Sequence, residues 1–270
     1  MMSSKQGSQP ITETQLKRID ELEARTKPMT ENMKLEYAEL VYKRDNPPPI
    51  QLGDTCIDLL MDTYAWETQQ MINVSRESLD IMATSKGKKC EQDSITLLCR
   101  HDKVLYKEHK DTIENEFLTG HLDIYLGESV MQSENVTDIK SAFDYPSFLK
   151  KIHAGIDNGY REQVGGYADI TGAREGWIAY CLVDNPEEDI LEMQYRIAKK
   201  MGALTTESPE FLQEWEKWDR SMRFSHIPVN QRVKKFKVDL FSTEERQKIY
   251  DRVKYCRDWL SKFDEEYQKL

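Results

Sequence analysis

One nearly continuous apolar stretch, 175–184, constrains the fold of this chain more than any other segment. It reads Glu-Gly-Trp-Ile-Ala-Tyr-Cys-Leu-Val-Asp. A strand with one face in water alternates apolar and polar side chains, whereas a strand covered on both faces is apolar throughout. We therefore expect 175–184 to be a central strand of a sheet, with other elements packed on both of its faces.

Two shorter segments upstream also have the pattern of strands. In 119–127, apolar residues occupy every second position from Leu122 to Leu126, and 135–142 is a second segment of this kind. If these two strands pair with each other, Asp123 on the first stands beside Asp138 on the second. The sequence thus predicts a sheet that brings two carboxylates together.

Apolar residues at helical spacing predict helices on either side of these strands. They indicate helices between 54 and 99, a helix from about 146 to 171, and two helices after 184. A short edge strand is expected near 104–106, a further strand at 232–240, and a last helix from Ser242, which has a capping-box glutamate three residues later.

The N-terminal part has a different organisation. Thr12, with Gln15 three residues later, and then Thr30 provide N-cap residues that begin two short amphipathic helices. Three consecutive prolines at 47–49 stop helix formation. We therefore predict an N-terminal helical extension over 1–50, folded as a hairpin, and one domain over 51–270.

Composition limits the compartment and the class of the protein. The N-terminus is polar and has no secretory signal pattern, and no apolar run reaches the length of a membrane span, so we expect no membrane partner. The five cysteines form no Cys-x-x-Cys pair, which favours free thiols in the cytoplasm and argues against structural zinc. We also expect no iron–sulfur cluster.

The formal net charge of −10 does not favour binding to nucleic acid, but basic residues cluster locally. Binding to phosphates needs only a local positive surface. The clusters are Arg220 to Lys237, which contains no acid, Lys86 with Lys88 and Lys89, and Lys150 with Lys151 and Arg161. Each cluster alone is more simply an ordinary solvated surface, whereas together they favour a path for DNA.

Three acids and one lysine have the order of a divalent metal site. Asp138 and Lys140 are two apart in a strand, so both project from one face. Neighbouring carboxylates repel unless a cation lies between them, and hard oxygen ligands suit Mg²⁺ or Mn²⁺. We expect Glu91, Asp123, Asp138 and the carbonyl of Ile139 to bind the metal, and Lys140 to orient or help deprotonate the attacking water. The alternative is a set of surface acids and a surface salt bridge.

Three residues on the expected helix after 146 are candidates for substrate binding. Gln163 and Tyr167 are four apart and share one face, and Tyr160 precedes them. Gln163 would hold the attacking water or a nucleotide, and the tyrosines would contact a phosphate or stack on a base. Purely structural roles for the tyrosine and the glutamine are equally consistent with the sequence.

The combined pattern resembles the PD-(D/E)XK nuclease superfamily, and within it the phage lambda exonuclease, YqaJ and RecB-type branch. The residues that carry the resemblance are Glu91, Gly120-x-x-Asp123, Asp138-Ile139-Lys140 and Gln163-x-x-x-Tyr167. It spans about 75–185. Asp138 departs from the glutamate that this branch more often has. The resemblance implies a restriction-endonuclease-like α/β fold, with a mixed central sheet flanked by helices, and magnesium-dependent hydrolysis of DNA. It also implies phage-type recombination in a bacterial or phage-infected cell, beside a single-strand annealing protein.

Three functions remain open at this point. The first is an exonuclease in which Lys88 and Arg161 join the substrate-binding residues. The second is an endonuclease of the same fold, which a separate base-reading module would have favoured. The third is a catalytically silent DNA-binding subunit, although such a protein has no chemical reason to keep all three acids and the lysine. The terminal helices could also mediate a homo-oligomer.

Overall fold

The computed structural model describes residues 11–46, 52–71 and 82–269, in two compact units that divide after residue 72. The first unit contains α1 (Glu13–Glu23), α2 (Glu31–Asp45) and α3 (Asp54–Gln69). α1 and α2 form the predicted hairpin, in which Arg18 of α1 contacts Glu36 of α2 at 3.0 Å. The prolines at 47–49 lie outside the described residues, and the single domain over 51–270 stays a prediction.

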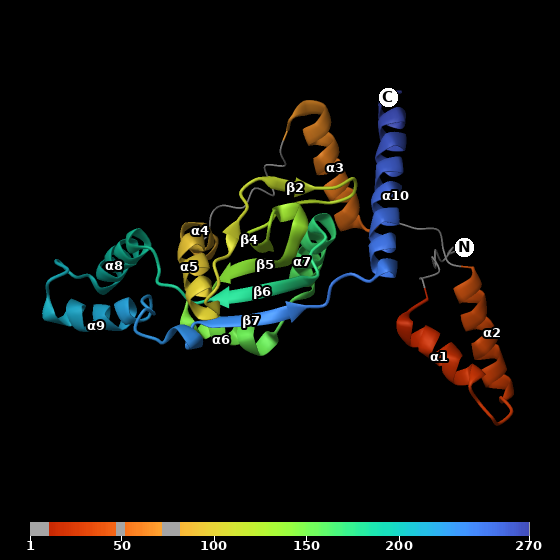
Figure 1. Cartoon of the computed structure of the whole chain (residues 1–270), viewed down its shortest axis with the longest axis horizontal. Coiled ribbons are helices and arrows are strands. Elements are labelled where there is room, and N and C mark those ends of the chain that lie inside the picture. The colour runs from red at the N-terminus through yellow and green to blue at the C-terminus, as the bar shows by residue number, and fades with distance from the viewer. Residues whose placement is uncertain (1–10, 47–51, 72–81, 270) are drawn as a thin grey trace. The chain divides into compact units, whose positions relative to one another are not determined.

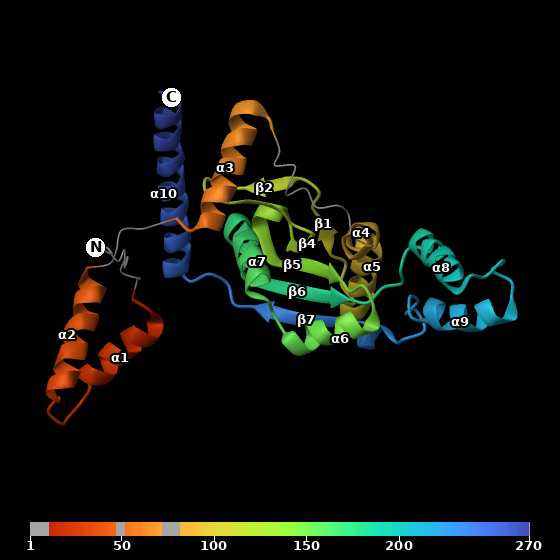
Figure 2. The same cartoon turned by 180° about the vertical axis from the view of Figure 1, so that it is seen from behind.

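The second unit is a mixed sheet flanked by helices, which confirms the predicted fold class (Figures 1 and 2). Its helices are α4 (Met82–Lys89), α5 (Glu91–Asp102), α6 (Tyr145–Ala154), α7 (Asn158–Thr171), α8 (Glu187–Met201), α9 (Pro209–Arg220) and α10 (Thr243–Tyr267). Its strands are β1 (Lys107–Glu108), β2 (Thr112–Glu114), β3 (Thr119–His121), β4 (Ile124–Gly127), β5 (Ser133–Ser141), β6 (Glu175–Cys181) and β7 (Val233–Val238).

The main sheet has the strand order β1-β4-β5-β6-β7. β5 and β6 are parallel, and the other neighbours are antiparallel. β2 and β3 form a separate two-stranded sheet. β1 and β7 are the edges of the main sheet, and β7 carries Lys234, Lys235 and Lys237. β6 is an interior strand, as its apolar sequence predicts.

Both faces of β6 are buried, which explains why its sequence does not alternate. Ile178 and Tyr180 belong to the core under α6 and α7, whereas Ala179 and Cys181 belong to the core under α5. Each of these four side chains is at most 2% exposed. The sheet therefore lies between two helical layers, and its strand ends are where polar side chains can gather.

The segment 119–127, expected to be one strand, forms two strands in different sheets. β3 pairs with β2, where Gly120 lies opposite Ile113, whereas β4 pairs with β1 and β5. The chain crosses between the sheets at Leu122 and Asp123. The prediction of a single strand was wrong because an alternating pattern does not specify the partner strand. The break places Asp123 at the start of β4.

Two other boundaries also differ from the prediction. The helix expected over 146–171 is two helices, because Gly155 has φ +76°, which ends α6, and the side chain of Asp157 caps α7. The edge strand expected at 104–106 begins later, as β1. Lys103 has φ +57° and ends α5, and residues 104–106 connect it to β1.

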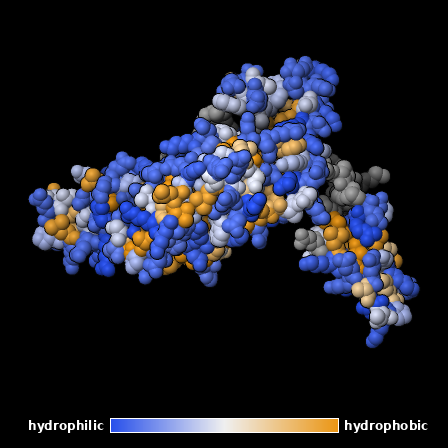
Figure 3. Space-filling model, in the orientation of Figure 1, coloured by the Kyte–Doolittle hydropathy of each residue, from blue (hydrophilic) through white to orange (hydrophobic). Residues whose placement is uncertain are grey.

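The described helices include none that is long and apolar enough to cross a membrane. Figure 3 shows hydrophilic residues over most of the visible face, with hydrophobic residues in separate groups. Charged residues make up 32% of the sequence, which accounts for this surface.

Candidate active site

Strand pairing brings the two central carboxylates together. Thr137 on β5 lies opposite Ile124 on β4, so in this antiparallel register Asp138 lies beside Asp123. Asp138 and Lys140 project from the same face of β5, and Asp138 Oδ2 is 2.8 Å from Lys140 Nζ. The neighbourhood of Asp123, Asp138 and Lys140 that the strand patterns predict is present.

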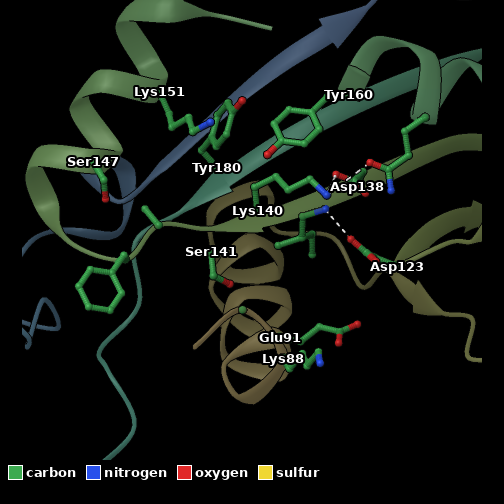
Figure 4. Close-up of a pocket in the computed structure, with 15 residues that line it drawn as sticks. Lys88, Glu91, Asp123, Asp138, Lys140, Ser141, Ser147, Lys151, Tyr160 and Tyr180 are labelled. Carbon is green, nitrogen blue, oxygen red and sulfur yellow. Dashed lines mark hydrogen bonds and ion pairs between the residues drawn. The ribbon is translucent and has the colours of Figure 1, made fainter. Parts of the chain in front are cut away.

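These residues lie in a pocket of about 610 Å³ (Figure 4). In that view, Glu91 and Lys88 reach into the pocket from the helical segment below the carboxylates, and Ser147 and Lys151 lie on the opposite side. The polar lining consists of Lys88, Glu91, Asp123, Asp138, Lys140, Ser141, Ser147, Lys151, Tyr160, Gln163 and Tyr180. Acids and bases thus occupy one open pocket at the end of the sheet.

The carboxylates in the pocket hold their protons more tightly than ordinary acids do. Burial, together with the charge of Asp138, raises the pKa of Asp123 to about 6. Burial also raises the pKa of Asp138, although the ammonium of Lys140 opposes the change. The pKa of Glu91, which is only partly desolvated, is raised by that desolvation and then by the charges of Asp123 and Glu108. When these acids are ionised, their negative charge therefore exceeds the single positive charge of Lys140.

The oxygen atoms around β5 are only partly satisfied. Asp138 is 1% exposed, and its Oδ2 atom has the ion pair with Lys140 but no hydrogen bond of good geometry. Asp123 Oδ2 accepts a hydrogen bond from the backbone N–H of Ile139 at 2.6 Å. The N–H and C=O of one strand residue point to the same edge, so the carbonyl of Ile139 also faces Asp123. A carboxylate oxygen has more than one lone pair, so Asp138 Oδ2 can contact a metal ion in addition to Lys140.

The donor set therefore fits a hard divalent cation, with the oxygens of Asp123, Asp138 and Ile139 at its centre. Glu91 is exposed, at the start of α5, and is within electrostatic range of Asp123. As the side chains stand, no three His, Cys, Asp or Glu residues among the described residues lie close enough to hold a metal ion. Glu91 would have to approach the pair to complete a three-carboxylate site.

Lys140 connects the acids to α7. Burial acts to lower its pKa, but Asp138 outweighs this effect and the net pKa is raised, so the ammonium is charged. Its Nζ lies 3.5 Å from Gln163 Oε1 and 4.8 Å from the centre of the Tyr160 ring. Gln163 donates to the hydroxyl of Tyr167 at 2.7 Å. The predicted face of α7 therefore meets the predicted lysine.

Tyr167 differs from the other α7 residues because it is 7% exposed and belongs to the core. It lies against Gly120, where an added Cβ would come within 2.5 Å of its ring. Gly120 thus leaves space for this ring, and the Tyr167 hydroxyl accepts a hydrogen bond that orients the side chain of Gln163. Tyr160, in contrast, lines the pocket directly.

The two predicted basic contacts are placed differently. Lys88 lines the pocket beside Glu91. Arg161 lines another cavity, between α7 and α10, and its guanidinium lies 2.8 Å from Glu245 of α10. The structure therefore brings Lys88 to the carboxylates but does not bring Arg161 there.

Several of the other basic residues also pair with acids. In the stretch from Arg220 to Lys237, Arg223 pairs with Glu187 and Asp219, Lys235 with Asp102, and Lys237 with Glu175. Lys86 is completely buried, which contradicts its interpretation as part of a solvated or phosphate-binding cluster. Local sequence suggested a surface lysine because its neighbours Gly87, Lys88 and Lys89 are polar or small.

Sequence reasoning missed three polar residues of the pocket, Ser141, Ser147 and Tyr180, and named Lys151 only as a member of a basic cluster. Ser147 and Lys151 are one helical turn apart on α6, where Asp144 and Ser147 form a capping box. Asp144 followed three residues later by serine is a signal that could have located this helix start. Tyr180 lay hidden in the apolar strand, and only the three-dimensional structure shows that it reaches the pocket.

No family model matches the chain, and no curated protein matches it in sequence. Solved structures do match its fold. A phage-related exonuclease from Haemophilus somnus 129PT is 17% identical, with a TM-score of 0.55 over 93% of this chain and 95% of that chain. An alkaline exonuclease from Laribacter hongkongensis, LHK-Exo, is 10% identical, with a TM-score of 0.51 over 82% of this chain and 87% of that chain.

A second structure of LHK-Exo, in complex with dAMP, is 9% identical over the aligned residues, with a TM-score of 0.50 over 93% of this chain and 89% of that chain. At these identities the likeness shows a shared fold. The chain therefore has the fold of phage-related and alkaline exonucleases over most of its length.

Proposed function

We propose that this protein is a metal-dependent deoxyribonuclease, and an exonuclease rather than an endonuclease. The observation that carries the proposal is the pair of crowded carboxylates, Asp123 and Asp138, beside the charged Lys140 in an open pocket. A pair of this kind is unfavourable in a protein that binds no cation. The fold shared with two proteins described as exonucleases agrees with this chemistry.

The residues that would hold Mg²⁺, or Mn²⁺ in its place, are Asp123, Asp138, the carbonyl of Ile139 and, after a side-chain movement, Glu91. When bound, such an ion lowers the pKa of a coordinated water and polarises a phosphate oxygen. Lys140 would orient the attacking water and stabilise the negative charge that develops on the phosphate. The hydrolysis is an in-line attack of water oxygen on phosphorus, in which the opposite P–O bond breaks.

The rest of the pocket would hold the DNA strand. Gln163 lies next to the Lys140 ammonium and would position the attacking water or a nucleotide by hydrogen bonding. The opposite side offers Lys151 to backbone phosphates, and Tyr160 to a phosphate or a base. Lys88 would contact phosphate from the Glu91 side. These groups give the negatively charged protein a local site for a negatively charged polymer.

We further infer a role in phage-type DNA recombination or repair, in the cytoplasm of a bacterial or phage-infected cell. The proposed partners are DNA, a single-strand annealing protein and further copies of this chain. The likeness of fold to a protein described as phage-related supports this inference.

The test uses end-labelled linear duplex DNA and closed circular DNA, each with Mg²⁺ or with EDTA. Wild-type protein is expected to degrade the linear DNA only, and only with Mg²⁺, and the label lost first gives the polarity. Cleavage of the circle would instead indicate an endonuclease. Binding of DNA without cleavage, over a range of Mg²⁺ and Mn²⁺ concentrations, would indicate a catalytically silent subunit.

The matched control is Asp138→Ala, with its fold checked by circular dichroism. This variant is expected to lose cleavage and Mg²⁺ binding while it remains folded. Cleavage at the wild-type rate by folded Asp138→Ala would remove Asp138 from the active site.

A further inference from the structure

A row of buried residues runs along one face of α4 and α5. Lys86, Cys90, Ser94 and Leu98 are spaced four apart, so they lie one above another on one helical face, although Cys90 separates the two helices. All four are at most 2% exposed. Two of them, Lys86 and Ser94, are polar, and a fully buried lysine is unusual unless its ammonium is paired.

Lys86 has the most demanding environment of the four. Its Nζ atom donates to the carbonyls of Phe143 at 3.1 Å and Val183 at 2.7 Å, and to Asn185 Oδ1 at 2.5 Å. An ammonium has three N–H donors, so these three acceptors satisfy it completely. Burial still lowers the pKa of Lys86 to about 8, which shows how strongly the site disfavours a charge. The lysine is nevertheless suited to this position, because an apolar side chain would leave the three acceptors without this donor.

Cys90 and Ser94 contact the same part of the sheet. The Cys90 thiol contacts the carbonyl of Asp184 at 3.4 Å, and the hydroxyls of Ser94 and Ser141 are 2.8 Å apart. Ser141 is the last residue of β5, and Asp184 follows β6. The acceptors of Lys86 likewise come just after β5 and β6, so its ammonium joins the ends of both central strands to one helix.

The end of α4 and the start of α5 form a helical corner. The face of this corner next to the buried row lines the candidate active site. Gly87, Lys88 and Glu91 belong to the pocket lining, and Glu91 begins α5 one helical turn after Gly87. The contacts that hold this corner against the ends of β5 and β6 therefore also determine the position of Glu91 relative to Asp138. Lys86 is more than one helical turn from Glu91, and its ammonium donates to backbone and amide oxygens rather than to the pocket carboxylates.

We propose that Lys86 is a positioning residue of the metal site: its ammonium holds the α4–α5 corner on the ends of β5 and β6 and so places Glu91 for its approach to Asp123 and Asp138. This inference rests on the proposed function, because it assumes that Glu91 contributes to cation binding. Lys86 itself touches neither the metal nor the DNA.

The test measures Mn²⁺ binding to the full chain without DNA, by calorimetry and by electron paramagnetic resonance of the free ion. Lys86→Met keeps an unbranched side chain and removes all three donors. We expect its Kd for Mn²⁺ to rise about tenfold, the lower end of the range for residues that orient metal ligands. Lys89→Met is the matched control, because Lys89 lies on the same helix but pairs with Glu188 and Asp189 of α8. Its Kd is expected to stay within about twofold of wild type.

A double-mutant cycle separates positioning from a general loss of stability. If Lys86 acts through Glu91, then adding Lys86→Met to Glu91→Gln should change the Mn²⁺ affinity no further than Glu91→Gln alone. A variant that only loosens the fold would weaken binding to the same extent in both backgrounds. Additive effects, or an unchanged Kd in Lys86→Met, would overturn the proposal.

A milder variant covers the case in which Lys86→Met does not fold. Asn185→Ala removes one of the three acceptors and is expected to raise the Kd for Mn²⁺ about threefold, also only when Glu91 is present. A wild-type Kd here would equally overturn the proposal. Failure of wild-type protein to bind Mn²⁺ would instead contradict the proposed metal site itself, so the two failures are distinguishable.

Discussion

Two lysine–carboxylate clusters at the main sheet, Asp138 with Lys140 and Asp102 with Lys235, have opposite electrostatic character. Asp102 accepts hydrogen bonds from Lys235 at 2.6 Å and Tyr106 at 2.5 Å, and its other oxygen is 2.6 Å from a ring nitrogen of His101. Burial works to raise the pKa of Asp102, but these bonds outweigh it and the pKa is lowered. The pKa of Asp138 is raised.

The difference separates a charge cluster that stabilises the fold from the cluster to which we assign a function. The Asp102 cluster satisfies its carboxylate with donors and holds the end of α5 on β7, so its ionised form contributes to folding. The Asp138 cluster has two adjacent acids, one lysine and an oxygen without a good hydrogen bond, so its ionised form opposes folding. Proteins keep such arrangements where a ligand relieves them.

The largest effect should come from Asp138→Asn, which removes one charge from the crowded pair. We expect the rate of nucleotide release from linear duplex DNA to fall by about 10³-fold or more, because the cation loses a buried ligand. Asp102→Asn, measured per folded molecule, is the control and should keep the wild-type rate. A rate within tenfold of wild type for Asp138→Asn would erase the functional distinction between the clusters.

Lys140→Met should have the next largest effect on hydrolysis. We expect the single-turnover rate to fall about 10²-fold, since a group that assists water and stabilises charge is lost. Mn²⁺ affinity should be unchanged or tighter, because a positive charge next to the site is removed. Weaker Mn²⁺ binding with an unchanged single-turnover rate would reverse the role assigned to Lys140.

Asp102→Asn should mainly affect stability. The substitution leaves the half-buried ammonium of Lys235 without its carboxylate partner. Breaking a buried ion pair on one side lowers the free energy of unfolding by about 3 kcal/mol. Urea unfolding followed by circular dichroism measures the change. Asp102→Asn with unchanged stability would show that this cluster is not the structural member of the comparison.

Asp123→Asn should have the smallest effect. Measured without metal, it should raise the free energy of unfolding, whereas Asp102→Asn lowers it. The folded-state pKa of about 6 is above the value of about 3.9 for an unfolded aspartate, so the stability that this group contributes falls as the pH rises through 6. Because the variant has no carboxylate to ionise, its free energy of unfolding should exceed that of wild type by about 1 to 2 kcal/mol above pH 6 and should equal it below pH 4. Urea unfolding with EDTA at several pH values tests this, and added Mg²⁺ should cancel the gain by stabilising wild type alone.

Sequence predicted the parts of the site that depend on local geometry. Asp138 and Lys140 share a face because side chains two apart in any strand do so, and Gln163 meets Tyr167 because residues four apart in any helix do so. The apolar run at 175–184 likewise predicted a strand covered on both faces. These features required no knowledge of distant partners.

The rest depended on contacts between residues far apart in the sequence. Lys86 reads as a surface lysine until its acceptors, 57, 97 and 99 residues away, are brought to it. Arg161 was expected at the DNA, but its partner Glu245 is 84 residues away on α10. The break at Leu122 was hidden because the alternating pattern is the same whichever sheet a strand joins.

The edges of the main sheet have a consequence for how copies of this chain can associate. An edge strand exposes backbone N–H and C=O groups that can pair with another chain, and lysines on the edge discourage such pairing. β7 has three lysines among its six residues, and β1, at the other edge, has only two residues. Continued sheet formation between copies is therefore disfavoured at both edges, and any oligomer is expected to form through side-chain surfaces instead.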